Sequence, residues 1–208
     1  MNFVRRFLSL SLAALCLVAA NPQPVTLIFY VGGQGDTATV ARLSAVMKAR
    51  LRAAGVSAAV ALLPKNRVQV SLQRGDPQVA ALLEAPGRIA FRIEPRGPVY
   101  GGNTTIKAAK AGQYMGLSAL YITLADGAAL QRFTSAHLNQ DMGIYVDGKL
   151  LYSPQIDSPI ANKIIIVGTN LSAQKARWIA GVLAGGPLPA PVRLVREYRA
   201  SSTQSGRS

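Results

Sequence analysis

The sequence predicts an α+β fold in which a ferredoxin-like split βαββαβ unit carries an inserted smaller α+β lobe and receives a returning C-terminal strand. Three observations lead to this prediction. Residues 25–94 alternate between strand and helix periodicity in the order β-α-β-β-α-β, which is that of the split ferredoxin-like unit. The composition then shifts at Arg96-Gly97-Pro98, and a second series of strands and helices follows. Finally, residues 190–200 alternate like a strand that returns to an existing sheet edge.

The elements of the first unit follow from periodicity and turn chemistry. Alternation with a period of two predicts four strands, at 25–31, 57–63, 67–73 and 88–94. Apolar residues at helical spacing predict helices at 37–55 and 76–85. Asp36 stands where the N-cap of the first helix is expected, and Gly55 stands at its C-terminal end. Pro64-Lys65-Asn66 makes the turn of a hairpin between the two middle strands.

The second unit follows residues 101–116, a Gly/Thr/Lys/Ala stretch without clean periodicity that predicts a linker or a mobile loop. Strands are predicted at 117–125, 142–146, 150–153 and 163–168, the last of them buried because its apolar run is unbroken. Helices are predicted at 126–138 and 171–186. Asp147-Gly148 predicts a tight hairpin turn, since both central residues of a type I′ turn need a positive φ.

The first twenty residues predict a cleavable signal peptide. Arg5 and Arg6 precede an apolar run, and Val18-Ala19-Ala20 supplies the small residues that a signal peptidase reads. We therefore expect a periplasmic protein, with anchoring in the inner membrane by an uncleaved signal as the alternative. The only cysteine, Cys16, lies in this segment, so the mature chain has no thiol for a disulfide or a metal site. The polar tail, 201–208, predicts disorder.

The formal net charge of +14 favours acidic partners such as anionic lipid headgroups, acidic polymers or acidic proteins. The lysines and arginines are scattered along the chain, and no basic run is interleaved with aromatic residues as in proteins that bind single-stranded nucleic acid. We expect no nucleic acid partner, and membrane contact that is at most peripheral.

The sequence offers little material for catalysis. Gly33-Gln-Gly35-Asp-Thr-Ala38 matches a dinucleotide-binding fingerprint, but the next predicted strand turns back as a hairpin and no acidic residue follows at its end. The single histidine, His137, stands near the end of a predicted helix, where the helix dipole explains it. Of the nine acidic residues, four already have cap or turn positions: Asp36, Asp76, Asp126 and Asp147. We therefore expect no enzyme activity, no cofactor and no metal.

A resemblance to a known family rests on the second unit. This unit shows, in chain order, six features that recur in the family: a helix with Thr134, the Asp147-Gly148 turn, a strand closed by Pro154, the Ile164–Gly168 strand, a helix opened by Ser172 and the Gly186-Pro-Leu-Pro189 exit. In this succession the chain resembles the first periplasmic domain of SecD/SecDF, clearly over residues 115–197 and more loosely before them. The resemblance implies a discontinuous base, at 21–96 and 190–200, that carries a head at 97–189.

The resemblance also implies a function, because the head of that family is thought to move and to hold emerging polypeptide. We expect weak polypeptide contacts from residues of the hairpin and the segment after it: Tyr145, Leu151, Tyr152, Ile156 and Ile160. The crossings between base and head predict hinges at Gly97, Pro98, Gly185, Gly186, Pro187 and Pro189. The family's membrane bundle and its Gly-rich motif are not found in the sequence, which predicts a freestanding copy of the domain.

Two functions are open at this point. The first is a non-enzymatic protein that binds extended polypeptide, or a partner such as a translocase or another envelope complex, during protein export or envelope biogenesis. The second is a basic docking or structural protein on a membrane complex or an anionic envelope surface. Salt separates them, because it screens the charge-driven mode more than an apolar contact.

Overall fold

The computed structural model of the chain describes residues 23–33, 36–101, 106–168 and 170–199. The expected signal peptide, 1–20, and the expected disordered tail, 201–208, lie outside these residues. Within the described ranges, no helix has both the length and the apolar character needed to cross a bilayer.

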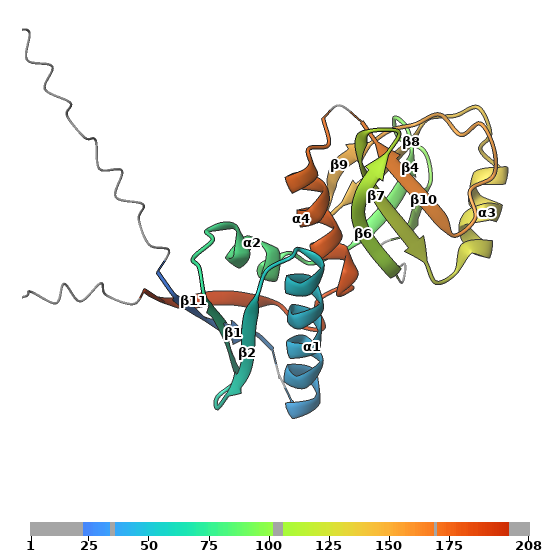
Figure 1. Ribbon diagram of the computed structural model, residues 1–208. Helices are drawn as coiled ribbons and strands as arrows, with labels where there is room; N and C mark the ends of the chain where they lie inside the picture. Colours follow the sequence, from blue (N-terminus) through green and yellow to red (C-terminus); the bar gives the residue numbers. More distant parts are fainter. Residues whose placement is uncertain (1–22, 34–35, 102–105, 169, 200–208) are drawn as a thin grey trace, which may run out of the picture.

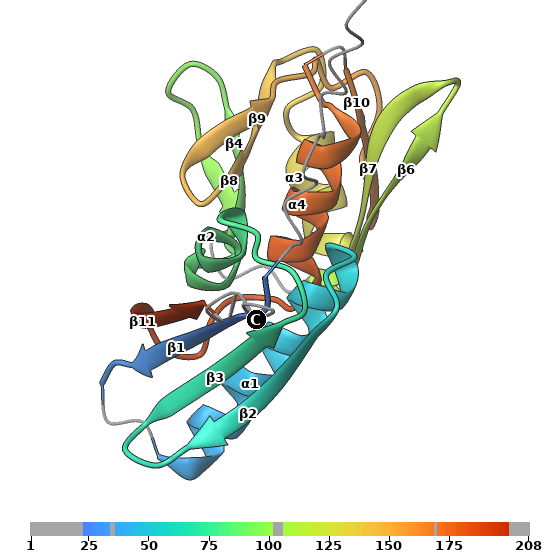
Figure 2. The same ribbon diagram turned by 60° about the vertical axis from the view of Figure 1, so that its left-hand side comes forward.

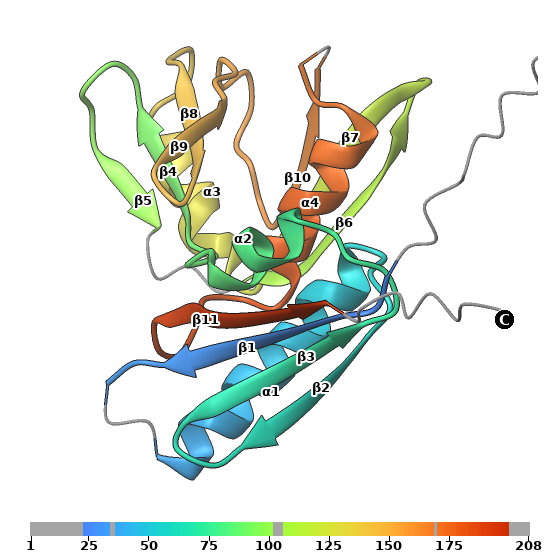
Figure 3. The same ribbon diagram turned by 90° about the vertical axis from the view of Figure 1, so that its left-hand side faces the viewer.

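A four-stranded antiparallel sheet contains both ends of the described chain. Its strand order is β11 (Val192–Arg199), β1 (Val25–Val31), β3 (Arg67–Leu72) and β2 (Ala58–Leu63). Helices α1 (Thr37–Ala53) and α2 (Gln78–Glu84) contribute to the apolar cluster on one side of this sheet. This is the ferredoxin-like arrangement with the returning strand β11 at the edge beside β1, so the predicted fold class is confirmed (Figures 1 and 3). We call this unit the base.

The strand predicted at 88–94 was wrongly assigned to the base. It is β4 (Ile89–Ile93), which pairs with β5 (Val99–Gly101) on one side and β8 (Met142–Val146) on the other, in a separate sheet. The chain turns away after α2 at Gly87, which adopts a φ of +78°, and β11 takes the place beside β1. Sequence periodicity indicates a strand but not the sheet that it joins.

The remaining elements form the head. One head sheet has the order β5-β4-β8-β9, in which β9 is Lys149–Tyr152. The other has the order β10 (Lys163–Val167), β7 (Leu117–Leu124) and β6 (Ile106–Tyr114). Helices α3 (Gly127–Ser135) and α4 (Ala173–Ala184) complete the head (Figure 2). Residues 102–105 lie outside the described part of the chain.

Two predictions for the head need correction. The linker or loop expected at 101–116 contains β6, which pairs with β7 along its length. The strand at 163–168, expected to be buried, is the edge strand β10, and its Ile165 side chain is 46% exposed. Although the strand is apolar throughout, only alternate residues are buried: Ile164 and Ile166 pack against the head core, and Ile165 points to the other face of the sheet.

Helix α4 connects the two apolar cores. Ile179 packs against the head core, whereas the neighbouring Trp178 packs against the core of the base. The approach of α4 to α1 is close: a Cβ added at Gly185 would lie 2.7 Å from the carbonyl oxygen of Val46. Only a residue without a side chain fits at this point of contact.

The two crossings between base and head lie side by side. The first runs from α2 to β4 through Pro86 and Gly87, and the second runs from α4 to β11 through Gly185–Pro189. The amide of Leu188 donates a 2.9 Å hydrogen bond to the Pro86 carbonyl and joins them. The predicted hinge at Gly97-Pro98 is therefore misplaced, since these residues form the turn between β4 and β5 within the head. Gly185, Gly186, Pro187 and Pro189 do lie at a crossing, and hinge motion there stays a prediction.

Candidate functional site

The candidate site is an apolar groove on the head, between the β8–β9 hairpin and α4. A cavity of about 360 Å³ opens there. Its apolar lining comes from the hairpin and from one side of the helix, through Val146, Leu150, Leu151, Trp178, Ile179 and Val182. Asp147, Lys149 and Lys175 supply its polar lining.

The hairpin turn that borders the groove is fixed to the crossing after α2. Asp147 and Gly148 adopt φ angles of +50° and +77°, as the predicted turn requires. The Asp147 carboxylate accepts a 2.8 Å hydrogen bond from the Arg88 amide, and the Asp147 amide donates a 2.9 Å bond to the Arg88 carbonyl. The groove wall is therefore held at the point where the chain enters the head.

A bulge in the hairpin turns Leu151 toward the groove. Ile144 pairs with Tyr152 and Tyr145 pairs with Leu150, so Leu151 is left as the extra residue of β9. Leu151 also lines a second cavity of about 180 Å³ between β9 and the end of β10. The two cavities share Leu151 and Lys175, so they adjoin along the N-terminal half of α4.

The outer edge of β9 borders this groove. Among the described strands β9 pairs only with β8, and β10 pairs only with β7, so each ends its sheet. An edge strand presents backbone N–H and C=O groups to whatever lies beside it. The site thus combines two strand edges with apolar cavities, and this combination suits an extended chain better than a compact small molecule.

Two of the five predicted contact residues line the groove or the cavity that adjoins it. Leu151 lines both cavities, and Tyr152 lines the smaller one. Tyr145 lies outside the lining of either cavity. Its hydroxyl donates a hydrogen bond to Glu94 and accepts one from Arg92, whose guanidinium carbon lies 4.5 Å from the tyrosine ring centroid. The hydrogen bond to Glu94 raises the pKa of Tyr145 above its ordinary value.

The other two predicted contact residues pack inside the head. Ile156 is completely buried in the head core, which corrects its assignment as a surface contact. Ile160 is half-buried against the same core, and its amide donates a 2.8 Å hydrogen bond to the hydroxyl of Thr134. Apolar residues near a proline are as consistent with packing in a core as with binding at the surface. The sequence alone does not distinguish these two roles.

The sequence interpretation missed the helical wall of the groove. Lys175, Trp178, Ile179 and Val182 recur at spacings of three and four, so they share one face of α4. The sequence contained a sign of this wall, because the apolar residues of the helix cover more than one of its faces. Packing against a single core needs only one apolar face. Ala176, Ala180 and Leu183 are its completely buried side chains, and Trp178 and Val182 lie outside that set.

Comparison with known proteins assigns the fold. Residues 81–190 match the family described as SecDF, P1 head subdomain. The chain belongs to this family. Among the relatives named protein translocase subunit SecD, that of Aquifex aeolicus is 31% identical over 123 residues, and that of Leptotrichia buccalis is 22% identical over 188 residues. These alignments cover 58% and 86% of this chain but 24% and 46% of the two relatives, so the chain spans less than half the length of either.

Solved SecDF structures share the fold of base and head together. One is described as "Structure and function of a membrane component SecDF that enhances protein export". The match covers 85% of this chain and 100% of that one, with a TM-score of 0.64 and 18% identity. Another, described as the "Crystal structure of SecDF in Super-membrane-facing form", has a TM-score of 0.67 at 18% identity and matches 86% of this chain and 30% of its own. The chain thus shares the fold of these SecDF structures over both its base and its head.

Proposed function

We propose that this chain is a non-enzymatic periplasmic protein that holds extended polypeptide in the groove between β9 and α4 during protein export. The observation that carries the proposal is the outer edge of β9, which pairs with no other strand in the described part of the chain and lies beside an apolar cavity. Relatives are named as subunits of a protein translocase, which supports an export role and a translocase as partner.

The physical basis is strand addition. An extended peptide that lies along a sheet edge gains main-chain hydrogen bonds that do not depend on its sequence. Its alternate side chains point to opposite faces, so every second one can enter the cavity lined by Leu151 and Val182. Such a site recognises an unfolded backbone with an apolar side chain, which is the common property of polypeptides that have not yet folded.

The test is binding of the 21–208 chain to a fluorescently labelled, carboxymethylated polypeptide that cannot fold, followed by anisotropy. The informative variant is Leu150→Asp, because Leu150 lines the groove and is 55% exposed, so folding should tolerate the change. Leu62→Asp is the matched control on the base, at 48% exposure. We expect binding that persists in about 0.5 M salt, where exposed charges are largely screened, and that falls at least tenfold in Leu150→Asp only.

Equal affinity of the two variants would contradict the groove as the binding site. Binding lost in salt by the unaltered chain would contradict an apolar polypeptide contact altogether. It would favour charge-driven docking instead.

A further inference from the structure

The base sheet has a second face, which α1 and α2 do not cover. Alternation along β1 buries Val25, Leu27, Phe29 and Val31 in the core of the base, so Thr26, Ile28 and Tyr30 point the other way. The pairing register places their neighbours on the same side: Ser71, Gln69 and Arg67 on β3, and Tyr198, Arg196 and Arg193 on β11. We call this the outer face. Figure 1 shows α1 on the opposite side of the sheet.

The outer face is basic. It carries Arg67, Arg193 and Arg196, and the register places no carboxylate among its described residues. The one acidic residue of β11, Glu197, pairs opposite Leu27 and therefore belongs to the other face, where it forms a 2.8 Å ion pair with Arg199. Strand alternation thus separates the charges, with the arginines on one side and the ion pair on the other.

Two tyrosines accompany the arginines. Tyr30 and Tyr198 are 45% and 48% exposed. The Arg196 guanidinium donates a 3.0 Å hydrogen bond to the Tyr198 hydroxyl, and Arg67 donates a 3.1 Å bond from Nε to the Pro64 carbonyl. These bonds orient both side chains and use only part of the donors that a guanidinium offers.

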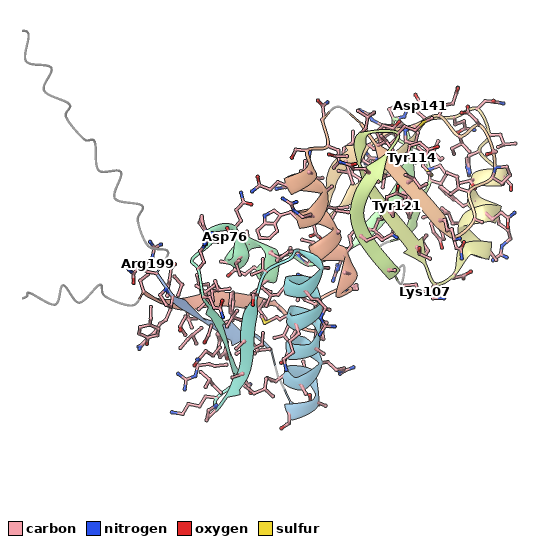
Figure 4. The ribbon with its side chains drawn as sticks, viewed as in Figure 1. Asp76, Lys107, Tyr114, Tyr121, Asp141 and Arg199 are labelled. Atoms are coloured by element: carbon pink, nitrogen blue, oxygen red, sulfur yellow. The ribbon has the colours of Figure 1, made fainter. Side chains whose placement is uncertain are left out.

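We propose that the outer face binds an anionic phospholipid surface. The guanidinium fork matches phosphate oxygens, and tyrosine rings favour the boundary between headgroups and acyl chains. A sheet face also meets a planar surface over several residues at once. The inference goes beyond the proposed function and does not depend on it, because the groove lies on the head and the outer face on the base. Figure 4 shows the base, with Asp76 and Arg199, apart from the sheets of the head, with Tyr114 and Tyr121.

Other occupants fit less well. A single-stranded nucleic acid needs adjacent aromatic rings on which successive bases stack. Tyr198 pairs opposite Thr26, four residues along β1 from Tyr30, so the backbone positions of the two tyrosines are about 13 Å apart along the strands. A protein partner would need a continuous apolar centre, whereas the middle of the outer face holds Ile28 between Gln69 and Arg196.

The test is cosedimentation of the 21–208 chain with vesicles of phosphatidylcholine, with and without about 30% phosphatidylglycerol. The variant is Arg67→Gln/Arg193→Gln/Arg196→Gln. Each basic residue near an anionic surface contributes about fivefold in affinity, so we expect a loss of about 100-fold for the triple variant. The matched control, Arg42→Gln/Lys48→Gln/Arg52→Gln, removes three exposed charges from α1 and should change binding by less than about fivefold.

Two further variants sharpen the test. Tyr30→Ser/Tyr198→Ser should weaken the part of the binding that survives salt, and Leu150→Asp should leave vesicle binding unchanged. An equal loss in the two triple variants would overturn the proposal, because net charge alone would then account for binding. So would equal binding to neutral vesicles, or tighter binding to a single-stranded oligonucleotide than to the anionic vesicles. Circular dichroism of each variant confirms that the fold is intact.

Discussion

The guanidinium of Arg50 donates a 3.0 Å hydrogen bond to the carbonyl oxygen of Gly186, and this contact joins α1 of the base to the crossing that leaves the head. The same guanidinium donates to the carbonyls of Leu82 and Ala85 at the C-terminal end of α2 and to that of Pro86 on the other crossing. Arg50 is completely buried, and burial lowers its pKa to about 10, so it remains charged at neutral pH. The C-terminal ends of α2 and α4 supply the partial negative charge that stabilises it.

Replacing Arg50 should destabilise the joint between base and head. In Arg50→Met the packing volume is largely kept, but four carbonyls lose the guanidinium as a donor inside the protein. Pro86 keeps a second donor, the amide of Leu188. We expect the free energy of unfolding to fall by about 3 kcal/mol, since each buried polar group left without a partner costs about 1–3 kcal/mol and some will find water. Arg52→Met, on an exposed position of the same helix, is the control. Urea unfolding measures both, and equal midpoints would contradict the role of Arg50.

Gly87 should not accept a side chain. Its φ is +78°, and an added Cβ would lie 2.4 Å from Nη2 of Arg50 and 2.8 Å from the Gly186 carbonyl oxygen. Gly148 has nearly the same φ, +77°, with nothing within 4 Å. Gly148→Ala should therefore cost about 1 kcal/mol for the left-handed backbone alone, and Gly87→Ala should cost at least about 2 kcal/mol more because it displaces Arg50. Thermal unfolding of the pair separates backbone strain from packing, and equal losses would show that the crossing can relax.

Trp178 should report occupation of the groove. It is the only tryptophan of the chain, and it lines the groove while packing against the core of the base. An apolar segment bound along β9 would exclude water from the indole ring. We expect a blue shift and an intensity change of intrinsic fluorescence on adding unlabelled unfolded polypeptide, and no change in Leu150→Asp. A shift that is unaltered in Leu150→Asp would place the bound chain elsewhere.

The pKa of Tyr145 should depend on Glu94. The hydrogen bond that the phenol donates to Glu94 favours the protonated form and raises this pKa above 10.0, its ordinary value. The stabilisation from this bond is present below the unfolded pKa and is lost as the pH rises through the folded one. Glu94→Gln should move the pKa down toward its ordinary value. Tyrosinate absorbance, taken as the difference between each protein and its Tyr145→Phe variant, measures the change, and identical titrations would contradict the assignment.

Local signals in the sequence predicted local structure well. Asp36 and Ser172 cap α1 and α4 as expected, with hydrogen bonds of 2.6 Å from the Thr39 amide and 3.1 Å from the Lys175 amide. Such contacts span three residues, so the sequence contains both partners. The Asp147-Gly148 turn was predictable for the same reason.

Contacts between distant residues were not predictable. The alternation of 88–94 is equally consistent with a place beside β1 and with its actual place between β5 and β8. Strand β6 was missed because its Gly, Ala and Lys residues have low strand propensity, and pairing with β7 overrides it. The groove was half predicted, since the hairpin carries a recognisable turn whereas the helical wall needs the packing of α4 to be known.

The pairing of β1 with β11 also fixes an order of assembly. During synthesis, which proceeds from the N-terminus, β1 is the first of the described strands to appear and its edge partner β11 is the last of them. The strands and helices of the head are contiguous from β4 to α4, so the head can complete its sheets before the base closes. Until residues 192–199 arrive, one edge of β1 is open to other chains. A chain truncated after residue 190 should therefore keep the head but self-associate. Size-exclusion chromatography of the truncated and full chains would show whether β11 prevents this self-association.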